Sequence, residues 1–319
     1  MGAAALGSRA IIGTFYETLQ QNIGNSWIPR VSMEFTSDQE SESYKWLGSS
    51  PSVREWVGGR LAKGLRSTGL TITNKVFEAT IKVLVDEIRR DQTGQVMLRV
   101  QEMADRVAAH PMSLLSTLIR NGGGATNGLA YDGQYFFDTD HSEGDSGTLI
   151  NDLAVGDYGV LNVATASAPT SNEMADAIMA VLGHFYTFKD DSGEPINELA
   201  KQFLVMVPTN LLGASQTAVS ANLLNTGSGG RDNPILKMGV SIDVVANTRL
   251  NADNAKFYMF RTDGRTKPFI LQNEQGVQID AIAEGSEHEF KEREHLYGVT
   301  VIRNVGFGMW QHAIRATLS

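Results

Sequence analysis

One serine and one histidine lie in sequence contexts that could support nucleophilic catalysis. Ser146 lies in the turn Gly144-Asp145-Ser146-Gly147, and His110 follows two alanines. A catalytic pair needs the histidine within hydrogen-bond reach of the serine, held there by a rigid double barrel. Ser146 follows His110 by only 36 positions and a strongly periodic stretch precedes His110, so no chain is left for the barrels. We therefore predict that His110 ends a helix and that Ser146 lies in an ordinary turn.

A second set of residues could support phosphate chemistry. Residues 136–140, FFDTD, resemble the strand and DxD signature of haloacid dehalogenase-type phosphatases, with Asp190 and Asp191 as a later metal pair. Such carboxylates can serve as nucleophile, general acid and Mg²⁺ ligands. The apolar run is only three residues long, however, and the lysine and the Gly-Thr of the signature are missing. We expect Asp138 and Asp140 to cap backbone amides in a tight turn, and a phosphatase stays a remote alternative.

The same stretch could also hold a cation. Its spacing does not match an EF-hand, because Glu143 stands where glycine is needed and no glutamate occupies the twelfth position. The candidate ligands for a weak structural Ca²⁺ or Mg²⁺ are Asp138, Asp140, His141, Glu143 and Asp145. Residues 122–128 are glycine-rich like a phosphate-binding loop, but Leu129 replaces the essential lysine. We predict no catalytic residue, no metal site and no cofactor.

The composition indicates a globular protein without a broad nucleic-acid-binding face. The chain has 319 residues, of which 42% are hydrophobic and 20% charged, with a net charge of −9. Affinity for nucleic acid comes mainly from clustered Lys and Arg, and no such cluster dominates the sequence. The absence of cysteine excludes disulfides, thiolate metal sites and a cysteine nucleophile. No apolar run approaches the roughly 20 residues of a membrane span, so we expect no membrane association.

Hydrophobic periodicity predicts the elements of the first 120 residues. Alternation over 31–36 and over 77–85 predicts two half-buried strands, and residues 52–66 have the cap and stripe of a short helix. The strongest helical pattern covers residues 95–120, with a kink or restart expected at Pro111. An uninterrupted helix of that length would span roughly 39 Å.

The remaining sequence mixes helices and strands. A capping box at Thr170 and Glu173 opens a helix over 171–187, and a second helix is expected over 209–221. The expected strands cover residues 202–207, 239–246, 256–262, 268–272 and 297–305. Because this order lacks the regular βαβ rhythm of a parallel sheet, the fold class is predicted to be α+β.

Residues 27–85 present a packing problem. They are predicted to form two long strands joined by a connection with a weak helix, and an isolated two-stranded ribbon is only marginally stable in water. Its apolar side must pack either on the rest of the chain or on a neighbouring copy. Charge favours the neighbouring copy.

The chain carries a basic and an acidic surface at different places. The basic residues of the connection are Arg54, Arg60, Lys63 and Arg66, and Trp56 lies among them. The acidic residues near the C-terminus include Glu287, Glu289, Glu292 and Glu294. If the two surfaces meet between copies, the contact is heterologous, and such contacts build rings and shells. The alternative is that both are ordinary solvated faces.

Several segments resemble the major head subunit of Mu-like tailed bacteriophages, and through it the Hong Kong 97-type capsid fold. The most specific is YDGQYFFDTDHS at 131–142. The other segments are 41–60, 70–91, 106–111 and 295–313. Residues 150–270 carry less resemblance.

The resemblance implies a division of the chain into the parts of that fold. It assigns an N-terminal arm (1–30), an extended loop (31–88), a peripheral domain with a spine helix (89–144), an axial domain (145–275) and the peripheral return strands (276–319). In this fold the extended loop lies across the adjacent subunit. A Lys–Asn isopeptide bond, present in some relatives, has no matching residues here and is not predicted.

The resemblance also implies a structural function. We expect hexamers and pentamers of an icosahedral head that encloses double-stranded DNA, which the subunits contact weakly and non-specifically. The expected partners during assembly in the host cytoplasm are a scaffold, a maturation protease and a portal. The sequence lacks a long helical extension of the scaffolding type, so we expect scaffold and protease to be separate proteins. A decoration protein is a further possible partner of the finished virion. The main alternative is an encapsulin-type bacterial compartment with the same fold.

Overall fold

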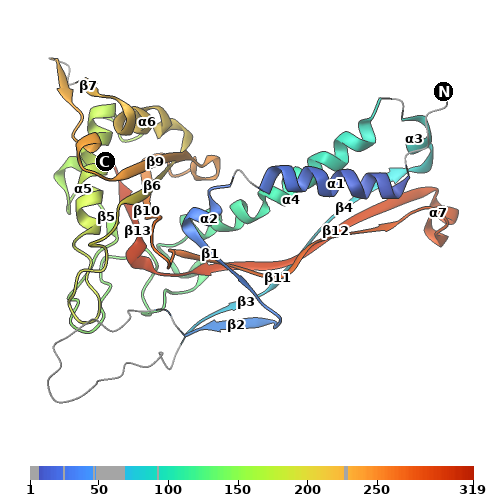
Figure 1. Cartoon of the computed structure of the whole chain (residues 1–319), viewed down its shortest axis with the longest axis horizontal. Coiled ribbons are helices and arrows are strands. Elements are labelled where there is room, and N and C mark those ends of the chain that lie inside the picture. The colour runs from blue at the N-terminus through green and yellow to red at the C-terminus, as the bar shows by residue number, and fades with distance from the viewer. Residues whose placement is uncertain (1–6, 24–25, 46, 48–68, 92, 226–228) are drawn as a thin grey trace.

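The structure is elongated, with a body at one end and a long arm at the other (Figure 1). This computed structural model describes residues 7–23, 26–45, 47, 69–91, 93–225 and 229–319. A five-stranded sheet forms the centre of the body, and a four-stranded sheet runs along the arm. Helices and both sheets together make an α+β architecture, as the sequence predicts.

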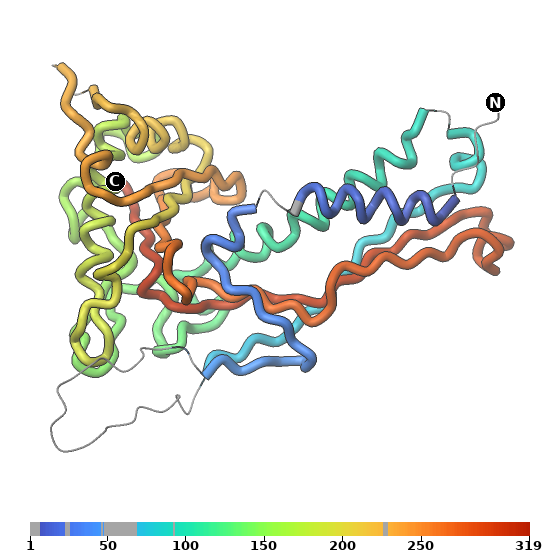
Figure 2. Tube along the Cα trace, viewed as in Figure 1, coloured from blue at the N-terminus to red at the C-terminus, as the bar shows by residue number. Residues whose placement is uncertain are grey.

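The arm is built around a long β-hairpin. Its strands β11 (Phe269–Ile282) and β12 (Glu294–Phe307) pair antiparallel over 14 residues each, which corresponds to about 46 Å of extended chain. Figure 2 shows them running side by side from the body to the tip of the arm. Strand β4 (Lys75–Leu84) pairs antiparallel with β12, and β1 (Ser32–Thr36) pairs parallel with β11, so the order is β1-β11-β12-β4.

Two helices cover one face of the arm sheet. Helix α4 (Gln95–Arg120) lies along it, and α1 (Ser8–Ile23) packs on α4 (Figure 1). Residues of β12 alternate between buried and half-buried, because only the face toward these helices is covered. The short helix α3 (Val85–Arg90) connects β4 to α4. Side chains of this core include Ile11, Phe15, Val83, Val100, Ala104, Tyr297 and Val299.

Helix α4 also joins the arm to the body. Its first half contributes to the arm core, whereas Leu115, Leu118 and Ile119 of its second half lie in the body core. The helix continues through Pro111, so the restart expected there does not occur. A proline inside a helix costs about 3 kcal/mol, and the burial of α4 on both sides of Pro111 offsets that cost.

The body confirms most of the elements expected from periodicity. Helix α5 (Ser171–Phe185) begins with the predicted capping box, and α6 (Leu212–Ser220) follows a 3₁₀ turn over Thr209–Leu211. The sheet has the order β5 (Asp152–Leu153), β13 (Ala313–Thr317), β10 (Lys256–Arg261), β6 (Gln202–Val207) and β9 (Ser241–Ala246). Smaller elements are α2 (Ile28–Val31) and the hairpin of β7 (Leu223–Asn225) and β8 (Gly230–Asp232).

The prediction of a free two-stranded ribbon over residues 27–85 was wrong. Strands β1 and β4 do not pair with each other, because they form opposite edges of the arm sheet. Only β2 (Ser41–Tyr44) and β3 (Leu70–Thr73) form a separate two-stranded piece, and Tyr44 and Ile72 pack on Ile270 and Met309 of the same chain. The described part of the ribbon therefore finds its apolar contacts within its own chain. The expected helix over 52–66 lies outside the described residues.

The length of β11 was underestimated. Residues 268–272 were expected to form a short strand, but β11 continues to Ile282 through the polar stretch Asn273–Gln278. That stretch alternates between exposed and half-buried positions, so it lacks a clear apolar signal. The predicted division of the chain into an N-terminal arm, an extended loop, a peripheral domain and an axial domain stays a prediction. The C-terminal strand β13 belongs to the body sheet, whereas β12 belongs to the arm sheet.

The capping box of α5 yields a stability prediction. The Thr170 hydroxyl accepts from the Glu173 amide at 3.2 Å, and the Glu173 carboxylate accepts from the Thr170 and Ala164 amides at 2.8 and 2.9 Å. Replacing Thr170 with alanine should lower the free energy of unfolding by about 1 kcal/mol. Urea denaturation of the isolated subunit measures this loss. The matched control is Thr165→Ala, an exposed threonine, and an equal loss in both variants would contradict the role of the cap.

Candidate intersubunit surfaces

The tip of the arm is a short acidic helix between the two long strands. Helix α7 (Glu287–Glu292) is capped by Ser286, whose hydroxyl accepts from the Glu289 amide at 3.1 Å. Glu287 and Glu289 lie in its first turn, where a carboxylate interacts favourably with the helix dipole. The helix ends at Arg293, which has a φ of 55°, and β12 follows directly.

Two of the four acidic residues expected at an interface are used within the chain. Glu289 accepts hydrogen bonds from the His295 ring at 3.0 Å and from the Gly285 amide at 2.6 Å. Glu294 pairs with Lys82 of β4 at 3.0 Å and with the His288 ring at 3.1 Å. The hydrogen bond from His295 lowers the pKa of Glu289, and the hydrogen bond from Lys82 lowers the pKa of Glu294. These bonds fasten α7 to the end of the sheet.

The other two acidic residues are exposed, and an exposed aromatic residue lies between them in the sequence. Glu287 forms only a solvated pair with Lys291, and Glu292 has no ion pair among the described residues. The aromatic residue is Phe290, whose side chain is 89% exposed. We call Glu287, Phe290 and Glu292 the α7 tip. The sequence analysis missed Phe290, although a single aromatic residue in the charged stretch EHEFKERE was a visible signal.

The basic residues of the expected contact fall between β2 and β3 in the sequence. Arg54, Trp56, Arg60, Lys63 and Arg66 lie outside the described residues. Their pairing with the acidic residues of α7 therefore stays a proposal.

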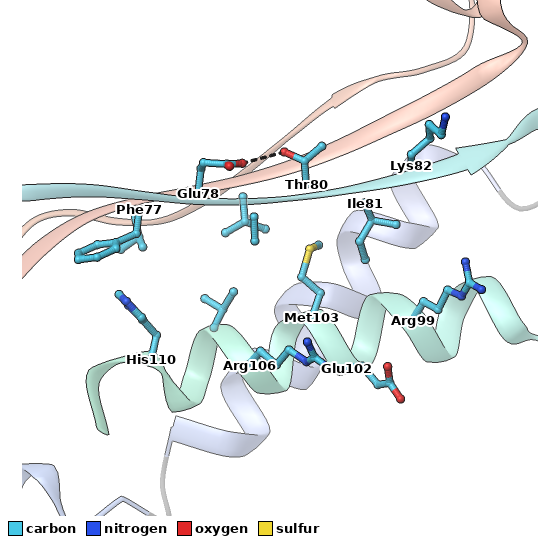
Figure 3. A pocket seen from close by; sticks show the side chains of 14 residues that line it. Phe77, Glu78, Thr80, Ile81, Lys82, Arg99, Glu102, Met103, Arg106 and His110 are labelled. Carbon is cyan, nitrogen blue, oxygen red and sulfur yellow. Dashed lines mark hydrogen bonds between the residues drawn. The ribbon is translucent and has the colours of Figure 1, made fainter. Parts of the chain in front are cut away.

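A groove between β4 and α4 is a second candidate surface (Figure 3). Its volume is about 610 Å³, and Phe77, Ile81 and Met103 contribute to an apolar floor. Arg99 and Arg106 line it without an ion pair to any described residue. Among the strands of the described ranges, β4 is an edge of the arm sheet, so the groove lies beside backbone groups that no described strand pairs with.

The structure does not bring together the serine and histidine that could have formed a nucleophilic pair. His110 lies near the middle of α4, where its ring contacts Phe77 at 4.3 Å, and it lines the β4–α4 groove. The expectation that it ends a helix was wrong, because α4 continues past it. Burial, with Arg303 and Arg249 nearby, lowers its pKa. The Ser146 hydroxyl accepts from the Glu143 amide and donates to the Gly147 carbonyl, as expected of a turn residue.

The aspartates of the phosphatase-like signature have structural contacts. Asp138 accepts from the amides of Tyr135 and Thr139 at 3.1 and 2.8 Å, which confirms its predicted role as a turn cap. For Asp140 the structure gives no such carboxylate bond among the described residues. The Asp190 carboxylate accepts from the amides of Ser192 and Glu194, again within a turn.

The stretch considered for a cation is organised around a buried histidine. The His141 ring bonds to Asp132 at 2.6 Å and stacks on Trp310 at 3.9 Å between ring centres. Within the described ranges, no three His, Asp or Glu side chains are grouped so as to hold a metal ion.

None of the helices in those ranges is both long and apolar enough to cross a bilayer.

Solved structures with similar folds show the fold of this chain. The procapsid protein of bacteriophage JBD30 is 23% identical, with a TM-score of 0.52 over 98% of this chain and 75% of that chain. The mature capsid protein of bacteriophage PhiM1 is 12% identical, with a TM-score of 0.53 over 92% and 87%. A virus-like particle from Pyrococcus furiosus is 8% identical, with a TM-score of 0.53 over 95% and 98%. The chain thus has the Hong Kong 97-type capsid fold, as expected.

The chain belongs to the family of the Mu-like prophage major head subunit gpT, whose model matches residues 9–157 and 230–318. It is 35% identical over 112 residues to the major capsid protein of Escherichia phage Mu. This match covers 35% of this chain and 36% of that protein. It is 34% identical over 108 residues to the Mu-like prophage FluMu major head subunit of Haemophilus influenzae, covering 34% of each. These matches span about a third of each relative. The predicted resemblance is confirmed, and the family is one of capsid proteins and not of enzymes.

The two kinds of glutamate on α7 should differ in their effect on the isolated subunit. Replacing Glu289 or Glu294 with glutamine weakens the bonds that hold the tip and should lower the thermal unfolding temperature. The matched changes Glu287→Gln and Glu292→Gln should lower it less, because these side chains are solvated. Glu287→Gln removes only a helix-dipole interaction and a solvated pair with Lys291. Differential scanning calorimetry measures both pairs, and equal effects would contradict the division.

The same division has a pH dependence. The folded-state pKa values of Glu289 and Glu294 are lowered, so their contribution to stability is present above the ordinary carboxyl pKa. It is lost as the pH falls through the lowered values. The difference in unfolding temperature between wild type and Glu294→Gln should therefore shrink on acidification.

Proposed function

We propose that this subunit assembles into hexamers and pentamers of an icosahedral phage head that encloses double-stranded DNA. Membership in the head-subunit family supports this function most directly. The matched relatives are named as a major capsid protein and a major head subunit. The similar solved structures are procapsids and capsids, which are assembled shells.

The arm gives this proposal a physical basis. A rigid arm that ends in an exposed phenylalanine and two solvated carboxylates presents a surface that one copy leaves unsatisfied. Aromatic residues are enriched at the contacts between proteins. We therefore place one subunit contact at the α7 tip.

From the charges we further propose what meets this tip. Arg54, Arg60, Lys63 and Arg66 of one copy, together with Trp56, would face Glu287 and Glu292 of the next copy. Glu289 and Glu294 would act by holding the helix in place. Because the two surfaces differ, the contact is heterologous and can close into rings.

Further partners belong to the same proposal. A scaffold, a maturation protease and a portal would act during assembly in the host cytoplasm, and the finished subunit would be part of the virion. A decoration protein could cover the shell. The net charge of −9 fits weak, non-specific contact with packaged DNA.

An encapsulin-type compartment is the alternative with the same fold. The likeness to the Pyrococcus furiosus particle is the observation in its favour. The family match favours the phage head, because it rests on sequence over most of the chain. Electron microscopy of particles from cells that co-express a scaffold, with nucleic acid extracted from them, separates a DNA-filled head from an enzyme-filled compartment.

Charge reversal tests the proposed contact. The double variant Arg60→Glu, Lys63→Glu should give folded subunits that form no shells, because like charges would then face each other. The variant Glu287→Lys, Glu292→Lys should fail in the same way. Combining all four changes should restore assembly, as seen by negative-stain microscopy.

The control keeps the charge and changes only the side chains, with Arg60→Lys and Lys63→Arg. This variant should assemble normally. Normal shells from either reversed variant would count against the contact, and so would four changes that fail to rescue it.

A further inference from the structure

A cavity lies beside the middle of α4, between the helices and the sheet of the arm. Its volume is about 620 Å³, and residues of α1, α2, α4, β1, β11 and β12 line it. Ile28, Met112, Leu271 and Val277 give it apolar walls. Cavities of this size, mostly apolar and with a few polar groups, are typical of binding sites for small ligands.

A buried arginine lines this cavity. Arg303 of β12 is only 6% exposed, and its Nε and Nη2 atoms have no hydrogen-bond partner among the described residues. Burial lowers the pKa of Arg303, and the nearby Glu34 carboxylate offsets this effect only in part. A buried charge that is left unpaired is costly. The described part of the chain therefore leaves the charge of Arg303 without a sufficient counter-charge.

A second cation increases this deficit. Lys75 of β4 is directly opposite Arg303 in the antiparallel pairing of β4 with β12, so the two side chains leave the sheet on the same face. Like charges in this position repel each other. An anion bound at Arg303 would reduce the repulsion as well as the cost of burial.

Three exposed carboxylates of the lining limit the charge that such an anion can carry. They belong to Glu34, Asp105 and Glu274. Glu34 accepts a hydrogen bond from Asn273 at 2.5 Å, and Asp105 accepts one from Asn22 at 2.6 Å. These carboxylates repel an anion, and they repel a doubly charged anion more strongly than a singly charged one. The cavity therefore favours a single negative charge, placed at Arg303.

We propose that Arg303 binds the carboxylate of an organic anion in this cavity. The planar guanidinium group matches a carboxylate in geometry and can donate two parallel hydrogen bonds to it. The apolar walls suit the hydrocarbon part of such a ligand. Water accepts hydrogen bonds from the same nitrogen atoms but leaves the charge unbalanced. The carboxylate belongs either to a free small molecule or to a side chain of another protein chain.

Acetate is the simplest probe of this site. Line broadening of carbon-13-labelled acetate in nuclear magnetic resonance measures its binding to the isolated subunit, with chloride keeping the ionic strength constant. Arg303→Met should raise the dissociation constant of acetate roughly tenfold or more, as expected for loss of hydrogen bonds to a charged group. The matched control Arg99→Met removes an exposed arginine of α4 and should leave acetate binding unchanged. Equal binding of acetate to Arg303→Met and to the wild type would overturn the proposal.

Thermal unfolding separates ligand binding from a structural role of Arg303. In chloride buffer, Arg303→Met should unfold at the same temperature as the wild type or at a higher one, because an apolar side chain replaces an unpaired buried charge. Acetate should raise the unfolding temperature of the wild type but not that of the variant. A variant that is less stable in chloride and still responds to acetate would assign Arg303 a structural role instead.

Inorganic phosphate provides a test that needs no variant. At a pH where it is mostly doubly charged, it should compete with labelled acetate on the wild-type subunit more weakly than unlabelled acetate does, because of Glu34, Asp105 and Glu274. Stronger competition by phosphate would overturn the assignment to a carboxylate.

Assembled shells distinguish the two sources of the carboxylate, and this arm alone rests on the proposed function. Acetate that still binds in shells would identify the ligand as a free small molecule. Acetate that binds isolated subunits but not shells would identify it as a side chain of another chain. A failure to form shells would count against the proposed function and would leave the result for the isolated subunit intact.

Discussion

The structure depends on one constraint, which is that α4 and the β11–β12 hairpin each belong to both the body and the arm. The hairpin has one face covered by α4, and α4 contributes side chains to two separate cores. Helix and hairpin are of similar length, about 39 and 46 Å, so together they make a stiff extension of the body. A stiff arm fixes the position of α7 relative to the body, which a subunit of a closed shell requires.

The acidic end of the arm has two functions that sequence alone could not separate. Glu289 and Glu294 are close in sequence to Glu287 and Glu292 but accept hydrogen bonds from His295, Lys82 and His288. They stabilise the tip, whereas the other pair stays available to a partner. The proposed contact surface is thereby reduced to Glu287, Phe290 and Glu292. A small, rigid tip of this kind is suited to a specific contact between copies, because little freedom is lost on binding.

Local signals in the sequence predicted local structure well. The capping box at Thr170, the apolar run of β6 and the helical stripe of α4 all appear where periodicity placed them. Strand pairing was missed, because β1 and β4 pair with strands more than 200 residues away and nothing local specifies that register. The predicted ribbon was expected to need a second copy to cover its apolar side. Tyr44 and Ile72 instead pack on Ile270 and Met309 of the same chain. The family resemblance was correct because it rests on sequence segments and not on the ribbon. Phe290 stands out as the one aromatic residue of a charged stretch, but its exposure is a property of the folded chain.

The central claim is that copies of this chain meet through the α7 tip at the end of the arm. Electron cryomicroscopy of assembled shells, at a resolution that shows side chains, tests it most directly. The account predicts that Phe290 is buried between two subunits, with Glu287 and Glu292 beside basic side chains of the neighbouring copy. A map in which α7 faces solvent, or in which Phe290 contacts only its own chain, would contradict it.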